Sequence, residues 1–329
     1  MTTAVDTTTY RDALREALRE GLRRDPHVVI LGEEVGRYGG AYGVTSGLLD
    51  EFGEDRVLDT PISEAGIVGA AVGAALAGLR PVVELMYVDF AALAMDQIVN
   101  QAAKARSMFG GQTGVPLVLR TQGGTGRSAG AQHSQSLEAW FLHTPGLRLY
   151  VPATVTDAHH LLLAALREPD PVVFVEHKAL YTTRSDLGAH APPPGVSVRR
   201  REGRDVTVVT YSRMLHRCLD AAQALAARGV EADVIDLRTL CPLDLEPVVA
   251  SARRTGRVLI VTEDTLTGGV SAELAARVTE LAFDWLEEPP MRLAGEDVPI
   301  PVAPALEEAS VPTPLRIERA ALRLLGRRA

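Results

Sequence analysis

The sequence predicts an α/β protein with two parallel-sheet domains, each carrying helices on both faces of its sheet. Its 329 residues are enough for two domains of ordinary size, each with its own core. In both halves, short apolar segments alternate with amphipathic helical segments, a pattern typical of parallel sheets covered by helices. Between the halves lies a segment rich in Pro, Gly and Arg that lacks periodicity. We therefore expect a first domain over 1–184, a linker over 185–204 and a second domain over 205–329.

The first half begins with a well-marked helix. Thr8 or Thr9 can cap it, leucines recur every four residues along one face, and Asp25-Pro26 ends it. Residues 66–79 predict a second helix, which is free of charge and contains four glycines. Because each glycine costs about 0.5–1 kcal/mol of helix stability, we infer that this helix packs closely against another element. Further strands are predicted at 28–36, 81–88, 115–121, 147–153 and 170–177, and further helices at 91–108 and 155–167.

The second half resumes the same alternation after the linker. Its apolar segments are short and its helical segments amphipathic, which again predicts a parallel sheet with both faces covered. The predicted strands are 205–212, 230–240 and 257–264, and the predicted helices lie near 214–228, 244–254, 271–283 and 315–326.

Composition excludes several functional classes. The formal net charge is −8 and the basic residues do not cluster, which disfavours binding of nucleic acid. Cys218 and Cys241 match neither a disulfide framework nor a zinc site. The N-terminus lacks a basic-then-apolar signal pattern, and no apolar stretch reaches the roughly 18 residues of a membrane span. We expect a cytoplasmic protein with no nucleic-acid or membrane partner.

Chemistry is expected in the loops, because parallel sheets bind ligands beyond the carboxyl ends of their strands. None of the glycine-rich loops has a correctly spaced dinucleotide or phosphate-binding motif. The pair His159-His160 indicates a solvated helix face rather than a metal site. Taken singly, each candidate residue also suits an ordinary structural role. Glu64 could be an acid that is stabilised by a helix dipole, His133 an ordinary loop histidine, and Phe90 a core residue. Four loops stand out as candidates for this chemistry: GEEVGRYGG, TPISEAG, TQGGTGRSAGAQHSQS and TEDTLTGG.

The motifs carry more information together than singly. The chain contains, in order, GEEVG, GGAYGVTSGL, DTPISEAGIVGAAVGAALAGLRPVVELM, DQIVNQAAK, AQHSQSLEAWF, DPVVFVEHKALY, VIDLRTLCPLD, a TGG-x-x-AE stretch and DVPIP. This series resembles the beta subunit of the thiamine-diphosphate-dependent, decarboxylating component of 2-oxo acid dehydrogenase complexes, over essentially the whole chain. The resemblance implies a transketolase-like pyrimidine-binding domain followed by a transketolase C-terminal-like domain.

The resemblance also implies roles for three residues. Glu64 matches the glutamate that bonds the aminopyrimidine ring nitrogen of thiamine diphosphate. A carboxyl group in an apolar pocket can share a proton with that nitrogen, which favours the imino tautomer that deprotonates the thiazolium carbon. Phe90 matches the aromatic residue that stacks on the pyrimidine, and His133 matches the active-site histidine associated with acyl transfer to a lipoyl group.

Some members of the family hold a potassium ion near the VPLVLR strand and a later turn. The sequence REPDP departs from the family pattern because Pro169 lies inside that turn, so a solvated turn is the alternative expectation. The positions that match the potassium ligands are Leu117, Ala165, Leu166, Glu168 and Asp170.

One family motif is missing from the sequence. Thiamine-diphosphate enzymes hold the diphosphate through a Mg²⁺ site that begins at a GDG motif, and no GDG occurs here. The resemblance therefore implies that a partner alpha subunit holds the Mg²⁺ and the diphosphate, in an alpha2-beta2 heterotetramer that serves a lipoyl acyltransferase core. The helix at 66–79 is a candidate surface for this subunit contact.

The acyl donor stays open between two classes of substrate. GGAYGVTSG and DVPIP resemble pyruvate-type members, the favoured hypothesis. Three other motifs resemble acetoin-cleaving members at least as much: DFAALAMDQIVNQAAK, AQHSQSL and EHKALY. Branched-chain 2-oxo acid enzymes tend to have Tyr where Phe90 stands, which disfavours them. Half of a split transketolase acting on ketose phosphates is a further alternative, against which the HSQ context speaks. A non-catalytic scaffold is disfavoured because Glu64 and His133 are both present.

Overall fold

The computed structural model describes residues 7–327, which form two compact units. Unit 1 takes the described residues up to Gly123 together with Trp140–Pro194. Unit 2 takes Gly124–Ala139 and the described residues from Gly195 onward. The loop that contains His133 therefore groups with unit 2, although it lies within the 1–184 segment of the sequence.

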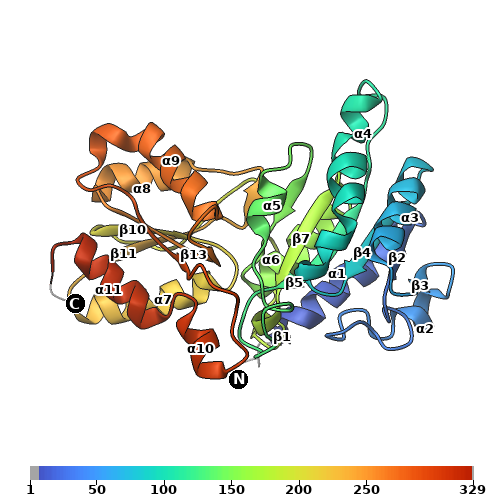
Figure 1. The fold of residues 1–329 in the computed structure, drawn as a ribbon, viewed down its shortest axis with the longest axis horizontal. Coiled ribbons are helices and arrows are strands. Elements are labelled where there is room, and N and C mark those ends of the chain that lie inside the picture. The colour runs from blue at the N-terminus through green and yellow to red at the C-terminus, as the bar shows by residue number, and fades with distance from the viewer. Residues whose placement is uncertain (1–6, 328–329) are drawn as a thin grey trace. The chain divides into compact units, whose positions relative to one another are not determined.

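Unit 1 is built on a parallel sheet with the strand order β6-β7-β5-β4-β2-β3 (Figure 1). Every neighbouring pair in this order is parallel. A separate antiparallel pair joins β1 (Thr7–Thr9) to β8 (Arg184–Asp186). The strands of the parallel sheet are β2 (Val28–Gly32), β3 (Val57–Asp59), β4 (Arg80–Leu85), β5 (Val118–Gly123), β6 (Arg148–Tyr150) and β7 (Val172–His177).

Helices cover both faces of the sheet in unit 1. Ile30 and Val82 belong to a core cluster with side chains of α1 and α6, while their strand neighbours Val29 and Val83 are buried outside that cluster. Since successive strand residues point to opposite faces, both faces are covered. The helices are α1 (Tyr10–Arg24), α2 (Leu48–Phe52), α3 (Glu64–Leu76), η1 (Val88–Ala94), η2 (Asp96–Ala102), α4 (Ala103–Met108), α5 (Glu138–Leu142), α6 (Val155–Ala165) and η3 (Lys178–Leu180). The first two residues of α5 group with unit 2.

Two helices of unit 1 show where sequence patterns succeed and fail. The first is confirmed: Thr9 accepts a hydrogen bond from the backbone N–H of Asp12 at 3.0 Å, and Asp25 caps the other end of α1. The continuous helix expected at 91–108 is wrong. A 3-10 helix (η1), a π-helix (η2) and a short α-helix (α4) occupy the region instead. Apolar periodicity predicts that the segment is helical, but it does not show whether each N–H bonds to the carbonyl three, four or five residues earlier.

The structure also tests two further expectations for unit 1, the packing of α3 and the exposure of His159. An added Cβ at Gly69 of α3 would lie 3.4 Å from Gln97 Oε1 of η2, an ordinary van der Waals contact, and one at Gly73 would meet nothing within 4 Å. The described residues therefore do not show the close packing inferred for this helix. His159 is buried rather than solvated, and its Nδ1 lies 3.1 Å from the carbonyl oxygen of Ala13. Burial lowers its pKa.

Unit 2 has a sheet of order β14-β13-β10-β11-β9, in which only β9 runs antiparallel to its neighbour. Helices α7 and α11 lie on one face and α8 and α9 on the other (Figure 1). The expectation of parallel sheets covered on both faces is thus confirmed in both units. The elements are β9 (Val198–Arg201), β10 (Val206–Thr210), α7 (Met214–Ala227), β11 (Ala232–Asp236), β12 (Thr239–Cys241), α8 (Glu246–Thr255), β13 (Val258–Thr265), α9 (Val270–Ala282), η4 (Phe283–Trp285), β14 (Met291–Gly295), α10 (Pro304–Ala309) and α11 (Pro314–Leu324).

Candidate active site

Glu64 is the first residue of α3 and follows the carboxyl end of β3. Its side chain is half-buried, and a carboxylate at this end of a helix is favoured by the helix dipole. Glu33, just beyond the neighbouring strand β2, is half-buried as well. Burial raises the pKa of Glu33, and the charges of Glu64 and Glu34 raise it further. Glu33 therefore favours holding a proton more than an ordinary glutamate does.

Sequence reasoning missed Glu33. The available signal was the GEEVG motif directly after a buried strand, which marked the loop but did not single out one of its two glutamates. The structure distinguishes them, because Glu33 is half-buried whereas Glu34 is exposed and has a left-handed backbone, with φ 54°.

Phe90 lies in η1, beyond the carboxyl end of β4 and therefore at the same edge of the sheet as Glu64. Its half-buried ring makes an edge-to-face contact with Tyr87, with ring centroids 6.3 Å apart. The Tyr87 backbone is left-handed, with φ 71°, and its N–H donates to Gln122 Oε1 at 3.1 Å. Lys178 Nζ lies 5.2 Å from the centroid of the Tyr87 ring. These contacts fix the start of η1, which packs against α3.

A buried charge cluster lies in the sheet of unit 1. Arg120 donates to Glu84 at 2.8 Å and forms a bidentate pair with Glu176 at 2.7 and 2.9 Å. Tyr181 also donates its hydroxyl to Glu176, at 2.6 Å. Burial by itself lowers the pKa of Arg120, but the two carboxylates raise it above its ordinary value. One cation thus pairs with both carboxylates and ties β4, β5 and β7 together below the edge that carries Glu64 and Phe90.

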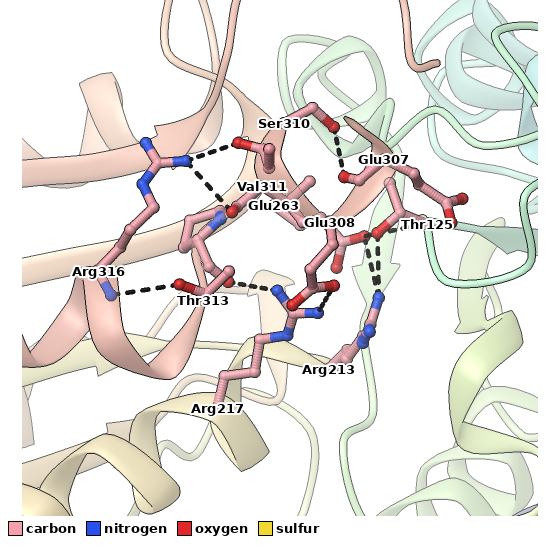
Figure 2. A network of polar contacts seen from close by, with 12 residues as sticks. Thr125, Arg213, Arg217, Glu263, Glu307, Glu308, Ser310, Val311, Thr313 and Arg316 are labelled. Carbon is pink, nitrogen blue, oxygen red and sulfur yellow. Dashed lines mark hydrogen bonds and ion pairs between the residues drawn. The ribbon is translucent and has the colours of Figure 1, made fainter. Parts of the chain in front are cut away.

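His133 lies in unit 2, in a loop fastened by hydrogen bonds to a buried carboxylate. Glu263 Oε1 accepts from both the backbone N–H and the hydroxyl of Thr125, each at 2.7 Å (Figure 2). Arg213 donates to the same hydroxyl at 3.0 Å. His133 itself is half-buried, and its backbone N–H donates to the carbonyl of Gly130 at 3.2 Å. The histidine therefore sits on a loop whose first residues are held firmly.

A second carboxylate holds the middle of this loop. The backbone N–H of Ser128 donates to both oxygens of Glu307, each at 3.1 Å, and Ser128 has a left-handed backbone with φ 52°. Gly124 N–H donates to the Gln135 carbonyl at 2.9 Å and closes the loop. Hydrogen bonds to a charged acceptor are stronger than neutral ones, so both anchors are substantial.

Beside the Thr125 anchor lies a buried acid cluster of Glu138, Glu263 and Asp264. Burial raises the pKa of Glu138 to about 8, with a further contribution from Asp264. Burial also raises the pKa of Asp264 to about 6. The hydroxyl of Tyr211, buried in the same unit, has no hydrogen-bond partner among the described residues, and burial raises its pKa too. Within residues 7–327, no group of three or more His, Cys, Asp or Glu side chains has a geometry suited to a metal ion.

The expected potassium ligands lie at the opposite edge of the sheet in unit 1. Leu117 precedes β5 and Asp170 precedes β7, whereas Glu64 and Phe90 follow the strands. The carboxylates of Glu168 and Asp170 are paired with arginine side chains. A potassium ion bound to the same oxygens would have to displace guanidinium groups, so the residues present do not fit it. Ala165 and Leu166, the other two positions, end α6 and precede this turn.

Two known protein families match the chain. Residues 6–184 match the family described as "Transketolase, pyrimidine binding domain", and residues 195–317 match "Transketolase, C-terminal domain". The chain is 46% identical, over 96% of its length and 85% of the relative's, to "Pyruvate dehydrogenase E1 component subunit beta-2, mitochondrial" of Oryza sativa subsp. japonica. The chain belongs to the transketolase-like E1 beta subunits. The family predicted from its motifs is thereby confirmed, and membership implies dependence on thiamine diphosphate.

Other E1-type relatives of this beta subunit are named for different substrates. It is 44% identical to "Acetoin:2,6-dichlorophenolindophenol oxidoreductase subunit beta" of Cupriavidus necator, over 91% of each chain. It is 43% identical to "2-oxoisovalerate dehydrogenase subunit beta" of Bacillus subtilis, over 94% of this chain and 96% of the relative. A solved structure titled "Split gene transketolase, inactive beta4 tetramer" shares the fold, with a TM-score of 0.80, 24% identity and coverage of 97% and 99% of the two chains.

Proposed function

We propose that this chain is the beta subunit of a thiamine-diphosphate-dependent 2-oxo acid dehydrogenase that decarboxylates pyruvate and passes the acyl group to a lipoyl group. The observation that carries the proposal is the pair of half-buried carboxyls, Glu64 and Glu33, at the edge of the sheet where Phe90 also lies. Carboxyl groups and an aromatic ring at one edge of the sheet fit an aminopyrimidine ring. Acetoin is the alternative substrate, because the acetoin relative is nearly as similar as the pyruvate relatives.

Thiamine diphosphate, when bound, supplies an electron sink for carbon–carbon cleavage. The role of Glu64 is to share a proton with the pyrimidine ring nitrogen, and a positioned acid–base group of this kind contributes about 10²–10⁴-fold in rate. Glu33 provides a second half-buried carboxyl close to Glu64. Phe90 presents an aromatic face on which a pyrimidine can stack.

His133 is proposed to act in acyl transfer to the lipoyl group. Support comes from the two carboxylates, Glu263 and Glu307, that fasten its loop. A histidine that exchanges protons with a transferring group needs a fixed position more than a buried one, since the lipoyl arm must reach it.

The remaining half of the cofactor is proposed to be held by an alpha subunit that supplies Mg²⁺, in a cytoplasmic alpha2-beta2 enzyme serving a lipoyl acyltransferase core. The exposed surface of α3 favours the presence of a partner subunit. Beyond Glu64 this helix has no charged residue, yet Gly66, Ala70 and Gly73 are exposed. A helix that is apolar all round is normally buried, so we expect a subunit to cover this face. In the described residues no helix is long and apolar enough to span a bilayer.

The proposal is tested in the complex assembled with the alpha subunit. Glu64→Gln should slow hydrogen–deuterium exchange at the thiazolium carbon by about 10²–10⁴-fold, the scale of one acid–base group. Glu54→Gln, an exposed glutamate on the same unit, is the matched control and should leave exchange unchanged. Gel filtration checks that both variants assemble. An exchange rate equal to that of wild type in Glu64→Gln would leave Glu64 as a helix-terminal acid only.

The substrate is tested with the same complex. A panel of pyruvate, branched-chain 2-oxo acids, acetoin and a ketose phosphate should give the highest kcat/KM with pyruvate. A preference for acetoin would select the alternative, and turnover of the ketose phosphate would point to transketolase-type chemistry instead. Isothermal titration calorimetry on the isolated chain should show no micromolar binding of thiamine diphosphate, because the diphosphate half of the site is expected on the partner.

A further inference from the structure

We propose that three arginines, Arg80, Arg106 and Arg148, take the place of a potassium ion in this chain and hold the turn between α6 and β7. The turn is the one in which related chains are expected to bind the ion. Its oxygen atoms are engaged by guanidinium groups instead, and these come from three separate elements of unit 1: β4, α4 and β6.

The two carboxylates of the turn carry the strongest evidence. Arg148 Nε lies 3.0 Å from Glu168 Oε2, and the Tyr150 hydroxyl donates to Glu168 Oε1 at 2.9 Å. Arg106 Nε donates to Asp170 Oδ1. Both carboxylates are more than three-quarters buried, with exposed side-chain fractions of 18% and 24%, so water screens these pairs less than ordinary surface pairs.

The backbone carbonyls of the turn are engaged as well. Arg80 Nη1 donates to the carbonyl oxygens of Leu166 and Glu168 at 3.1 and 3.3 Å. Arg106 Nη2 donates to the Pro169 carbonyl at 3.5 Å. These oxygens thus face guanidinium groups rather than a cavity that a cation could enter.

The two remaining positions are held by the backbone. The Ala165 carbonyl accepts from the N–H of Glu168 at 3.1 Å, and the Leu117 carbonyl accepts from the N–H of Val172 at 2.8 Å. A carbonyl oxygen has a second lone pair, so these two bonds alone do not exclude a metal. The guanidinium groups oppose one, because they already engage both carboxylates and two of the carbonyls, and the third arginine, Arg80, is itself balanced by Asp25 at 3.3 Å. No negative charge is left over to attract a further cation.

The packing around Pro169 shows that the turn is closed. A Cβ added to Gly114 would lie 2.1 Å from the Pro169 carbonyl oxygen, so only glycine allows the loop before β5 to approach this closely. The same Cβ would lie 2.6 Å from Arg106 Nη2. Pro169, the residue that departs from the family pattern, therefore lies where the arginine and the glycine loop meet.

The test compares thermal unfolding of the full chain in potassium chloride and in choline chloride at equal ionic strength. Wild type should unfold at the same temperature in both salts. Arg106→Met and Arg148→Met should each lower Tm by about 2–4 °C in choline chloride, the usual effect of losing one modest interaction in a chain of this size. Arg167→Met, which removes an exposed arginine next to the same turn, is the matched control and should not change Tm.

A double variant, Arg106→Met with Arg148→Met, makes the replacement itself testable. With both carboxylates released, potassium should raise its Tm relative to choline, whereas wild type shows no such difference. Potassium-specific stabilisation of wild type would overturn the proposal, as would elemental analysis that finds potassium retained after gel filtration. A double variant that is indifferent to potassium would also overturn it. The readout is unfolding and metal content, so failure here is distinct from failure of the proposed catalytic function.

Discussion

Each unit contains a cluster of buried carboxyl groups, and the two clusters offset the cost of burying charge in different ways. In unit 1, Glu84 and Glu176 share the guanidinium of Arg120 within the sheet. In unit 2, Glu138 and Asp264 have no such cation, and burial raises the pKa of the former to about 8 and of the latter to about 6. A buried carboxyl must gain either a counter-charge or a proton. The Arg120 cluster uses the first solution and the acid cluster of unit 2 uses the second, although Asp233 and Asp236 elsewhere in unit 2 are paired with arginines.

The difference has consequences for stability against pH. The Arg120 pairs persist throughout the neutral range, because a guanidinium does not lose its proton there. The acid cluster of unit 2 instead gains negative charge as the pH passes through the raised pKa values of Asp264 and Glu138. We therefore expect unit 1 to depend on one cation and unit 2 to depend on pH.

Arg120→Met is the strongest test of this contrast. The change leaves two buried carboxylates without their cation, and loss of one partner of a buried charge pair costs about 3–5 kcal/mol of unfolding free energy. Urea denaturation measures the effect, with Arg24→Met as a control because that arginine is largely exposed and pairs only with Glu20. A loss as small as that of the control would mean that protons can replace Arg120, and the contrast between the units would disappear.

Glu138→Gln tests the other half of the comparison. Because the pKa of Glu138 in the folded chain is raised from 4.5 to about 8, the folded state holds this proton more tightly than the unfolded state. Its contribution to stability is full below about pH 4.5 and is lost as the pH rises toward 8. Wild type should thus lose up to about 2 kcal/mol between pH 6 and pH 8, and Glu138→Gln should lose less.

The measurement for Glu138 is urea denaturation at several pH values between 6 and 8.5. Glu280→Gln, an exposed glutamate on α9, is the matched control and should follow wild type at every pH. If the Glu138→Gln profile is as steep as that of wild type, the titrating group lies elsewhere, and the acid cluster does not set the pH response of unit 2.

Sequence patterns captured the fold because they report local physics. The cap at Thr9 and the alternation of apolar strands with helices each depend on neighbouring residues, and both are confirmed. The helix expected at 91–108 failed for the same reason. The segment is apolar at intervals, but its hydrogen bonding is decided by packing against α3, which the local pattern does not contain.

The residues of the candidate site also differ in how well the sequence could predict them. Glu64, Phe90 and His133 could be selected only because uncommon motifs occur together, since each alone suits an ordinary structural role. The charge partners could not be predicted, because their pairing joins distant parts of the chain. Arg120 and Glu176 are 56 residues apart, and no local pattern indicates that one will face the other. For the same reason, the sequence did not indicate that Arg80, Arg106 and Arg148 would contact the turn before β7.

The smallest expected effect is that of Thr125→Val, which tests whether the acid cluster of unit 2 supports the loop that contains His133. The Thr125 hydroxyl lies between Glu263 and Arg213, so it links one carboxylate of the unit 2 cluster to a cation. Valine keeps the shape and removes two hydrogen bonds, which should cost about 1–2 kcal/mol of unfolding free energy. Amides of 124–139 should exchange faster with deuterium, and acyl transfer to a lipoyl acceptor should fall more than decarboxylation measured with an artificial electron acceptor. Thr279→Val, which removes only a local bond on α9, should change neither property. Unchanged loop exchange in Thr125→Val would show that the backbone hydrogen bonds to Glu263 and Glu307 are enough to hold the loop, and that the Thr125 hydroxyl does not contribute.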